Sequence, residues 1–307
     1  MPAATHESEG REETGRSLLR SAATITYDPI VDIDWDAPLD PDKLYVPEHR
    51  STLYGTSMWQ AMSHQQRVDL TRHEIASIAS MGIWFETILM QMLIRRAYDR
   101  DPRTANIQFT YTEIGDECRH SVMFAKLVDK LETPHYKPVS ALHRGGRLLK
   151  TLSNGPVCFA GALFVEEILD QLQREAMTDE SVQPLVRAVS RVHVVEEARH
   201  MRFAREEAAI EFSQQGFAAK EWSKLIVGAT AFLSSTQLVH PHVYTNVGLD
   251  AARARREAAA NPYWRTTLAW AARRVRESLE EIDMITGPGK WLWKRAGLLE
   301  SGARSHD

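Results

Sequence analysis

The stretches Asp-Glu-Cys-Arg-His at residues 116–120 and Glu-Glu-Ala-Arg-His at residues 196–200 decide the fold of this chain. In each copy the glutamate of Glu-x-Arg-His follows a lone glutamate after an identical interval, from Glu86 to Glu117 and from Glu166 to Glu197. Two helices with one glutamate each, and two with Glu-x-x-His, supply the ligands of carboxylate-bridged di-metal centres in four-helix bundles. The repeat therefore predicts an all-α bundle around a dinuclear metal site.

The spacing inside each copy requires a helix. Residues three and four apart share one face of an α-helix, so Glu117 and His120 point the same way, and Glu197 and His200 do too. The alternative interpretation is a pair of surface helices with ion-paired faces. The exact repeat of the interval favours the metal site, with one chelating pair on each of two helices.

The two lone glutamates lie in apolar surroundings. Ile83, Trp84 and Phe85 precede Glu86, and residues 163–165 before Glu166 are Leu-Phe-Val. A carboxylate there is costly unless it is ion-paired, which is the alternative, or bound to metal. Four glutamates would balance the charge of two divalent ions. Carboxylate and imidazole together suit iron, with manganese as the alternative, better than metals that prefer soft ligands.

Acidic residues directly before the two ligand glutamates predict a supporting network. We expect Asp116 and Glu196 each to accept the free ring N–H of a ligand histidine from the other copy. Arg119 and Arg199 are expected to complete this network, with surface ion pairs as the alternative for both arginines.

His193 breaks the symmetry of the repeat. It lies four residues before Glu197 and so shares the ligand face of its helix, whereas the equivalent position of the first copy is Glu113. His193 is either an extra metal ligand or a packed helix histidine. Glu113 is either a further ligand or an acid beside the ligands, and we expect the latter.

Composition and charge exclude several classes of protein. The chain has 307 residues, of which 25% are charged, and a net charge of −4, so neither a nucleic-acid-binding stripe nor a polybasic membrane patch is expected. Two cysteines make no disulfide framework, which favours a cytoplasmic protein. Residues 1–20 lack an apolar signal core, and the longest apolar run, residues 157–165, is too short to span a bilayer.

The remaining pattern predicts the organisation of the chain. Residues 1–22 are polar and are expected to be a disordered tail, and residues 23–307 to form a single all-α domain. The Pro- and Asp-rich residues 26–48 predict an extended arm that packs Ile30, Ile33, Trp35 and Leu39 on the body. Residues 134–146 are expected to be a connection. Helices are predicted over residues 68–98, 101–131 with an Asp101 cap and Pro102 in the first turn, 156–177, 184–215, 218–239, 248–259, 262–284 and 289–299.

The spacing of His193, Glu197 and His200, together with the interval from Glu166 to His193, resembles that of the AurF-type di-iron N-oxygenases. The resemblance extends over residues 60–245, including the Phe-Val-Glu-Glu stretch at 164–167 and His-Pro-His-Val-Tyr at 240–244. It implies a ferritin-like bundle with additional C-terminal helices, and two iron ions that activate dioxygen to convert an arylamine into hydroxylamine and nitro products. The ligands it implies are Glu86, Glu117, His120, Glu166, His193, Glu197 and His200.

Other features of the function stay open in the sequence. Because no flavin or nicotinamide motif appears, an external electron donor is expected beside dioxygen and a small-molecule amine. A homodimer is left open, and no catalytic residue beyond the metal ligands is assigned. The alternatives are a di-iron C–H hydroxylase or desaturase and a non-enzymatic ferritin-like iron-binding protein, against which His193 and the long C-terminal region argue.

The sequence near Glu86 bears on the substrate. Residues 78–82 offer no arginine for a substrate carboxylate. The substrate therefore either lacks a carboxylate or is anchored from the C-terminal helices, which hold Arg265, Arg273 and Arg274. Tyr244 is either a residue of the substrate pocket or an exposed loop tyrosine.

Overall fold

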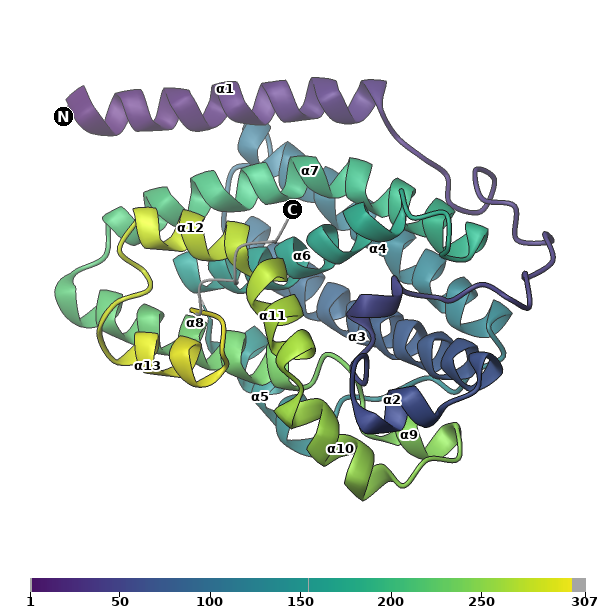
Figure 1. Cartoon of the computed structure of the whole chain (residues 1–307). Coiled ribbons are helices and arrows are strands. Elements are labelled where there is room, and N and C mark those ends of the chain that lie inside the picture. The colour runs from purple at the N-terminus through teal and green to yellow at the C-terminus, as the bar shows by residue number, and fades with distance from the viewer. Residues whose placement is uncertain (1, 154, 300–307) are drawn as a thin grey trace, which may run out of the picture.

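The computed structural model describes residues 2–153 and 155–299, and within these residues the chain is helical and has no strand. Four long helices carry the repeated motifs and pack in pairs, the first with the second and the third with the fourth (Figure 1). The predicted ferritin-like bundle is therefore confirmed. These helices are α3 (His64–Tyr98), α4 (Ala105–Lys130), α6 (Pro156–Ala176) and α7 (Pro184–Ser213).

The ends of these helices follow local capping chemistry. The Ser63 hydroxyl and the Gln66 side chain form a capping box at the start of α3. Pro156 and Pro184 occupy the first turns of α6 and α7, as predicted. The predicted start of α4 at Asp101 is wrong. Thr104 caps that helix, while the Asp101 carboxylate accepts from the backbone N–H of Arg103 at 3.0 Å in the preceding turn.

The N-terminal segment is a helix and not the expected disordered tail. Helix α1 (Pro2–Thr24) lies across α4 and α7 (Figure 1). Leu18 is buried, and Arg11 donates to the buried Glu207 carboxylate of α7 at 2.6 Å and 3.0 Å. The polar composition of this segment gave no sign of the buried Leu18 or of the contact with Glu207. The helix runs through residue 22, where the boundary of the tail was predicted. The assignment of residues 23–307 to one domain stays a prediction, since residues 300–307 lie outside the described part.

Residues 25–47 form the predicted extended arm, which ends at the short 3-10 helix η1 (Glu48–Arg50). Ile33 is buried and Trp35 and Leu39 are partly buried, as expected. Ile30 is 58% exposed, so its predicted packing is wrong. Ile33, and not Ile30, packs the arm on the body of the protein.

The region after α4 contains a helix where the sequence predicts a connection. Helix α5 (Ser140–Leu152) includes Gly145 and Gly146, the pair that favours a loop in the sequence. A Cβ on Gly146 would overlap the Trp84 ring, so this glycine allows α5 to approach α3. The low helix propensity of the pair is offset by packing.

The C-terminal helices pack around the bundle. The predicted helix over residues 262–284 is two helices, because the chain turns at Ala272. Trp293 is fully buried, and its ring meets the Phe164 ring edge-on, with the ring centroids 5.2 Å apart. Phe164 lies two residues before Glu166 on α6. The short helices α2 (Ser57–Ala61) and α9 (His242–Asn246) accompany α8 (Phe217–Thr236), α10 (Ala251–Ala260), α11 (Pro262–Ala271), α12 (Arg273–Glu281) and α13 (Gly287–Arg295).

Within the part of the chain that the structure describes, one helix, α3, is long and apolar enough to cross a membrane by length and composition. It is also a core helix of the bundle, and 56% of its most apolar 18-residue stretch is buried inside the structure. Core helices pass the same test, so this finding carries little weight for a membrane location.

A pair of glycines sets the distance between α8 and α13. A Cβ on Gly228 would lie 2.6 Å from the Gly289 carbonyl oxygen, and one on Gly289 would overlap the Lys224 carbonyl. Gly289→Ala must push α13 away, and we expect a loss of about 1–3 kcal/mol of stability and a lower thermal midpoint. The control is Gly115→Ala on α4, where a Cβ meets nothing within 4 Å. Equal midpoints for the two variants would contradict close packing at Gly289.

Candidate metal centre

Seven buried side chains from all four bundle helices meet at one level of the bundle. Each is at most 4% exposed. Their ligand atoms form three overlapping groups, each with atoms within 4.8 Å of one another and thus close enough to hold a metal ion. The structure therefore brings together every residue predicted as a ligand, namely Glu86 from α3, Glu117 and His120 from α4, Glu166 from α6, and His193, Glu197 and His200 from α7.

Two glutamates lie between two imidazoles at the centre of this cluster. His120 Nδ1 lies 3.1 Å from Glu117 Oε2 and 3.1 Å from Glu197 Oε1. His200 Nδ1 lies 3.1 Å from Glu117 Oε1 and 3.1 Å from Glu197 Oε1. Each carboxylate thus reaches both histidines. This is the placement that a carboxylate needs to bridge two cations.

The Nε2 atoms of both histidines are held by acids of the opposite copy. His120 Nε2 lies 2.9 Å from Glu196 Oε2, and His200 Nε2 lies 3.1 Å from Asp116 Oδ2. The carboxylates can only accept, so each Nε2 carries the proton. This crossed pattern is the one predicted from the sequence. It fixes the ring orientation and turns both Nδ1 atoms toward Glu117 and Glu197.

Two arginines and the N-terminal arm hold those acids in turn. Arg199 donates to Asp116 Oδ2 at 3.3 Å and to the Ile25 carbonyl at 2.8 Å. Arg119 pairs with Asp116 and lies 3.7 Å from Glu196. The backbone N–H of Tyr27 donates to Glu196 Oε1 at 3.0 Å, a contact that no sequence motif indicated. The backbone of the arm thereby supports both the arginine and the acid that orient the ligands.

His193 completes the cluster on the side of the two lone glutamates. Its Nε2 lies 3.6 Å from Glu86 Oε1 and 3.8 Å from Glu197 Oε1. Its Nδ1 lies 2.8 Å from Gln173 Oε1, an acceptor on α6, so Nδ1 carries the ring proton and Nε2 presents a lone pair. Sequence reasoning missed Gln173. The one available signal was its place two helical turns after Glu166, on the same face of α6.

Burial and charge set the protonation of the cluster. Burial, and then the neighbouring carboxylates Glu117 and Glu166, raise the pKa of Glu86 well above its usual value, and burial with Glu197 and Glu117 does so for the pKa of Glu166. Burial lowers the pKa of His193 to about 4, which keeps this ring neutral at pH 7.

The two central histidines behave in the opposite way. Burial lowers the pKa of His120 and His200, but their carboxylate partners outweigh it and raise both pKa values well above the usual one. Burial raises the pKa of Glu197 and the nearby Glu117 raises it further, yet the two imidazoles bring it down to about 2. Without metal, protons on the central imidazoles hold the carboxylates together.

The donor atoms left over are those that a pair of cations would use. Both oxygens of Glu86, Oε2 of Glu166, Oε2 of Glu197 and Nε2 of His193 are buried without a hydrogen-bond partner in the described part of the chain. Such atoms are costly unless something else binds them. Four carboxylates and three imidazoles fit two divalent ions that prefer oxygen and nitrogen. The role of the seven residues as ligands stays a prediction that this geometry supports.

The remaining candidate residues lie outside the ligand groups. Glu113 is buried on α4, and burial raises its pKa well above the usual value. Arg274 approaches Asp170 at 3.5 Å, and Arg265 donates to the Ala259 carbonyl at 3.0 Å. Tyr244 is buried and donates to the Thr52 hydroxyl at 2.9 Å, so the exposed-loop alternative is wrong.

A helical bundle with this buried carboxylate and imidazole cluster defines the ferritin-like class of metalloproteins. Within that class, the family model for p-aminobenzoate N-oxygenase AurF matches residues 8–283, and the chain belongs to this family. The resemblance found in the sequence is thus confirmed. Membership supports an oxidoreductase of the oxygenase type.

Similar curated proteins carry no assigned function. Uncharacterised proteins of Mycobacterium bovis and of two Mycobacterium tuberculosis strains are each 29% identical to the chain over 201 residues. The match covers 62% of this chain and 58% of each relative, which is less than two thirds of their length. These relatives add no substrate to what the family supplies.

Removing a central carboxylate should empty the centre. We expect Glu197→Ala to lose tight binding of both ions, because this glutamate reaches both His120 and His200. The measurement is metal content by mass spectrometry after anaerobic ferrous loading and desalting. Glu206→Ala is the control on the same helix, where Glu206 pairs with Arg202 at the surface. Two metals per chain in Glu197→Ala would contradict the ligand assignment.

Metal binding should release protons at neutral pH. In the metal-free protein the pKa values of Glu86, Glu166, His120 and His200 are all raised, so these groups hold protons that the metals must displace. The apparent metal affinity should therefore fall as the pH is lowered from about 7.5 to about 6, by about tenfold per pH unit for each proton released. An indicator dye in weak buffer measures the released protons during ferrous titration. An affinity independent of pH would contradict the protonated metal-free cluster.

Proposed function

We propose that the protein is a di-iron oxygenase that oxidises the nitrogen of an arylamine with dioxygen. The observation that carries this proposal is His193, whose unprotonated Nε2 faces Glu86 and Glu197 in the cluster. The ligand set of a ferritin-like protein that only stores iron is normally poorer in histidine. Family membership supports the same conclusion.

Two iron ions, when bound, supply the redox chemistry of dioxygen that the side chains themselves lack. Glu86, Glu117, His120, Glu166, His193, Glu197 and His200 would hold them. Conversion of an amine to a hydroxylamine places one oxygen atom on nitrogen and reduces the other to water. That reaction consumes two electrons and two protons, so an external electron donor is part of the proposal.

The chain's own residues have three tasks in this reaction. Asp116 and Glu196 hold the ligand imidazoles in one tautomer, while Gln173 does the same for His193. The apolar bundle around the centre excludes water. Glu113, which burial keeps protonated, is a proton reserve on α4 close to the central carboxylates.

Two cavities lined by Phe85, the residue before Glu86 in the sequence, bear on the substrate. One of them lies between α3, α6 and α8, with walls that include Met81, Phe85, Phe164 and Leu238, and at about 10 Å³ it is too small for a substrate. The second cavity, of about 420 Å³, shares Phe85 with it, and none of the described residues that line either cavity is charged. A carboxylate buried there without a partner would cost several kcal/mol. We therefore favour an arylamine without a carboxylate over one anchored by Arg265, Arg273 or Arg274.

The proposal also includes the setting of the reaction. The proposal keeps a cytoplasmic location and iron in preference to manganese. It leaves open whether the protein is a homodimer. A di-iron C–H hydroxylase or desaturase would use the same ligands, and a ferritin-like iron-binding protein would use most of them. Product analysis separates these alternatives.

His193 provides the test of this function. We expect His193→Ala to keep substantial iron, because six other ligands remain, but to lose most oxygen transfer to an amine. Iron content and product yield are measured together, with reductant and dioxygen, on aniline-type amines and on an aminobenzoate. His135→Ala, an exposed histidine outside the cluster, is the control.

Three results would contradict this view. If His193→Ala matches the wild type in both measurements, His193 is a packing residue and the iron-binding alternative gains. If only C–H oxidation products form, the hydroxylase alternative replaces the proposal. If the aminobenzoate is oxidised as efficiently as the neutral amines, the substrate preference is wrong while the oxygenase function stands.

A further inference from the structure

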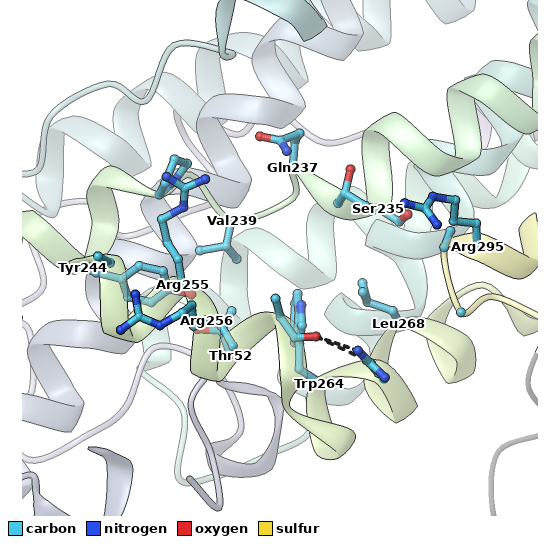
Figure 2. A pocket seen from close by; sticks show the side chains of 18 of the residues that line it. Thr52, Ser235, Gln237, Val239, Tyr244, Arg255, Arg256, Trp264, Leu268 and Arg295 are labelled. Carbon is cyan, nitrogen blue, oxygen red and sulfur yellow. Dashed lines mark hydrogen bonds between the residues drawn. The ribbon is translucent and has the colours of Figure 1, made fainter. Parts of the chain in front are cut away.

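A cavity of about 690 Å³ lies apart from the metal centre, between the C-terminal end of α8 and helices α9, α10, α11 and α13 (Figure 2). None of the seven predicted ligands lines it. Its volume is in the range of pockets that bind small organic molecules, about 300–1,000 Å³. The family's reaction gives this cavity no task.

Among the described residues, five cations line this cavity and no acidic residue does. None of the five has a carboxylate within 4.0 Å in the described part of the chain. Figure 2 shows that Arg255 and Arg295 approach it from different helices. The five are Arg255 and Arg256 from α10, Arg265 from α11, and Lys294 and Arg295 from α13.

A neighbouring arginine outside the cavity has the acidic partner that these five lack. Arg253 on α10 donates to Glu257 at 2.8 Å, whereas Arg255 and Arg256 on the same helix have no such partner among the described residues. Among the described residues, Arg265 donates only to the Ala259 backbone carbonyl, at 3.0 Å. The chain as a whole carries a net charge of −4, so this concentration of positive charge is local. Like charges around a concave surface repel one another and focus a field that attracts anions.

The floor of the cavity is suited to an organic ligand and not to an inorganic ion alone. Thr52, Ser235 and Tyr244 are buried there, and their hydroxyl hydrogens are donated to acceptors inside the protein. Trp264 and Leu268 add an aromatic and an apolar surface. A ligand with a planar ring could stack on the tryptophan while its anionic part meets the cations at the rim.

We infer that this cavity binds a phosphorylated organic molecule that carries at least two negative charges and a planar ring, the chemical class of a nucleoside diphosphate. Guanidinium groups match phosphate oxygens with paired hydrogen bonds. Several cations from different helices fit a ligand with more than one charge. The inference is independent of the oxygenase proposal, because it uses none of the metal ligands.

The test is calorimetric titration of the full chain, with metal loaded, at about 50 mM and about 300 mM salt. The probes are adenosine diphosphate, pyrophosphate, adenosine and citrate. We expect the diphosphate to bind most tightly, pyrophosphate more weakly because it lacks the ring, and adenosine not at all. Higher salt should weaken binding several-fold.

Matched variants locate the site. Arg255→Ala with Arg256→Ala, and separately Lys294→Ala, should weaken adenosine diphosphate binding by about tenfold or more. The controls are Arg253→Ala on α10 and Lys290→Ala on α13, which do not line the cavity and should change affinity less than twofold. All these positions are on exposed helix surface, and thermal melts check that each variant folds.

Several outcomes would overturn the inference. Wild-type protein that binds neither phosphate probe has no such site. If the cavity variants and the controls lose affinity for adenosine diphosphate equally, the anion is attracted to surface charge in general and not to this cavity. Citrate that binds as tightly as adenosine diphosphate means a general anion site without preference for phosphate and ring. The oxygenase proposal is tested by metal content and amine oxidation in variants of the metal ligands, none of which lines this cavity. Failure of the phosphate-binding test therefore leaves the oxygenase proposal intact.

Discussion

Mutual repulsion of buried carboxylates is the constraint on which this structure depends. Glu86, Glu117, Glu166 and Glu197 are each at most 4% exposed and converge on one level of the bundle. Such an arrangement is stable only if protons or cations neutralise it. The metal-free protein meets the constraint with protonated imidazoles and raised carboxyl pKa values, and metal ions would meet it without protons. The helices must be long and well packed because the centre itself opposes assembly.

The surrounding structure is organised to hold that centre. The acids that orient the imidazoles are themselves held by Arg199 and by the backbone of the N-terminal arm at Tyr27. A second ion-pair group lies farther along α7, where Arg11 of α1 and Arg96 of α3 share the buried Glu207. Trp293 packs on Phe164 of α6. Helix α1, the N-terminal arm and α13 therefore stabilise the positions of the helices that carry the predicted ligands.

The bundle and the ligand groups could be predicted from the sequence because they follow from helix periodicity. The repeated interval between a lone glutamate and Glu-x-x-His places side chains on faces without knowledge of any contact. The features that escaped prediction depend on contacts between distant segments. Helix α1 needs the partner Glu207, α5 needs the Trp84 ring against Gly146, and the tautomer of His193 needs Gln173. Of these contacts, only the one with Gln173 has a periodic signal, its place two helical turns after Glu166, and that signal does not identify His193 as its partner.

The two halves of the repeat differ most where the proposed chemistry takes place. His193 occupies the position that Glu113 occupies in the other half, and the two have opposite properties, since the lowered pKa of His193 makes it a neutral base and the raised pKa of Glu113 makes it a protonated acid. His193 faces Glu86, and Phe85, the residue before Glu86 in the sequence, lines two uncharged cavities. A symmetrical centre would treat both sides alike. The exchange of one glutamate for histidine leaves one side of the centre with a neutral ligand that the other side lacks, so the two sides are chemically different.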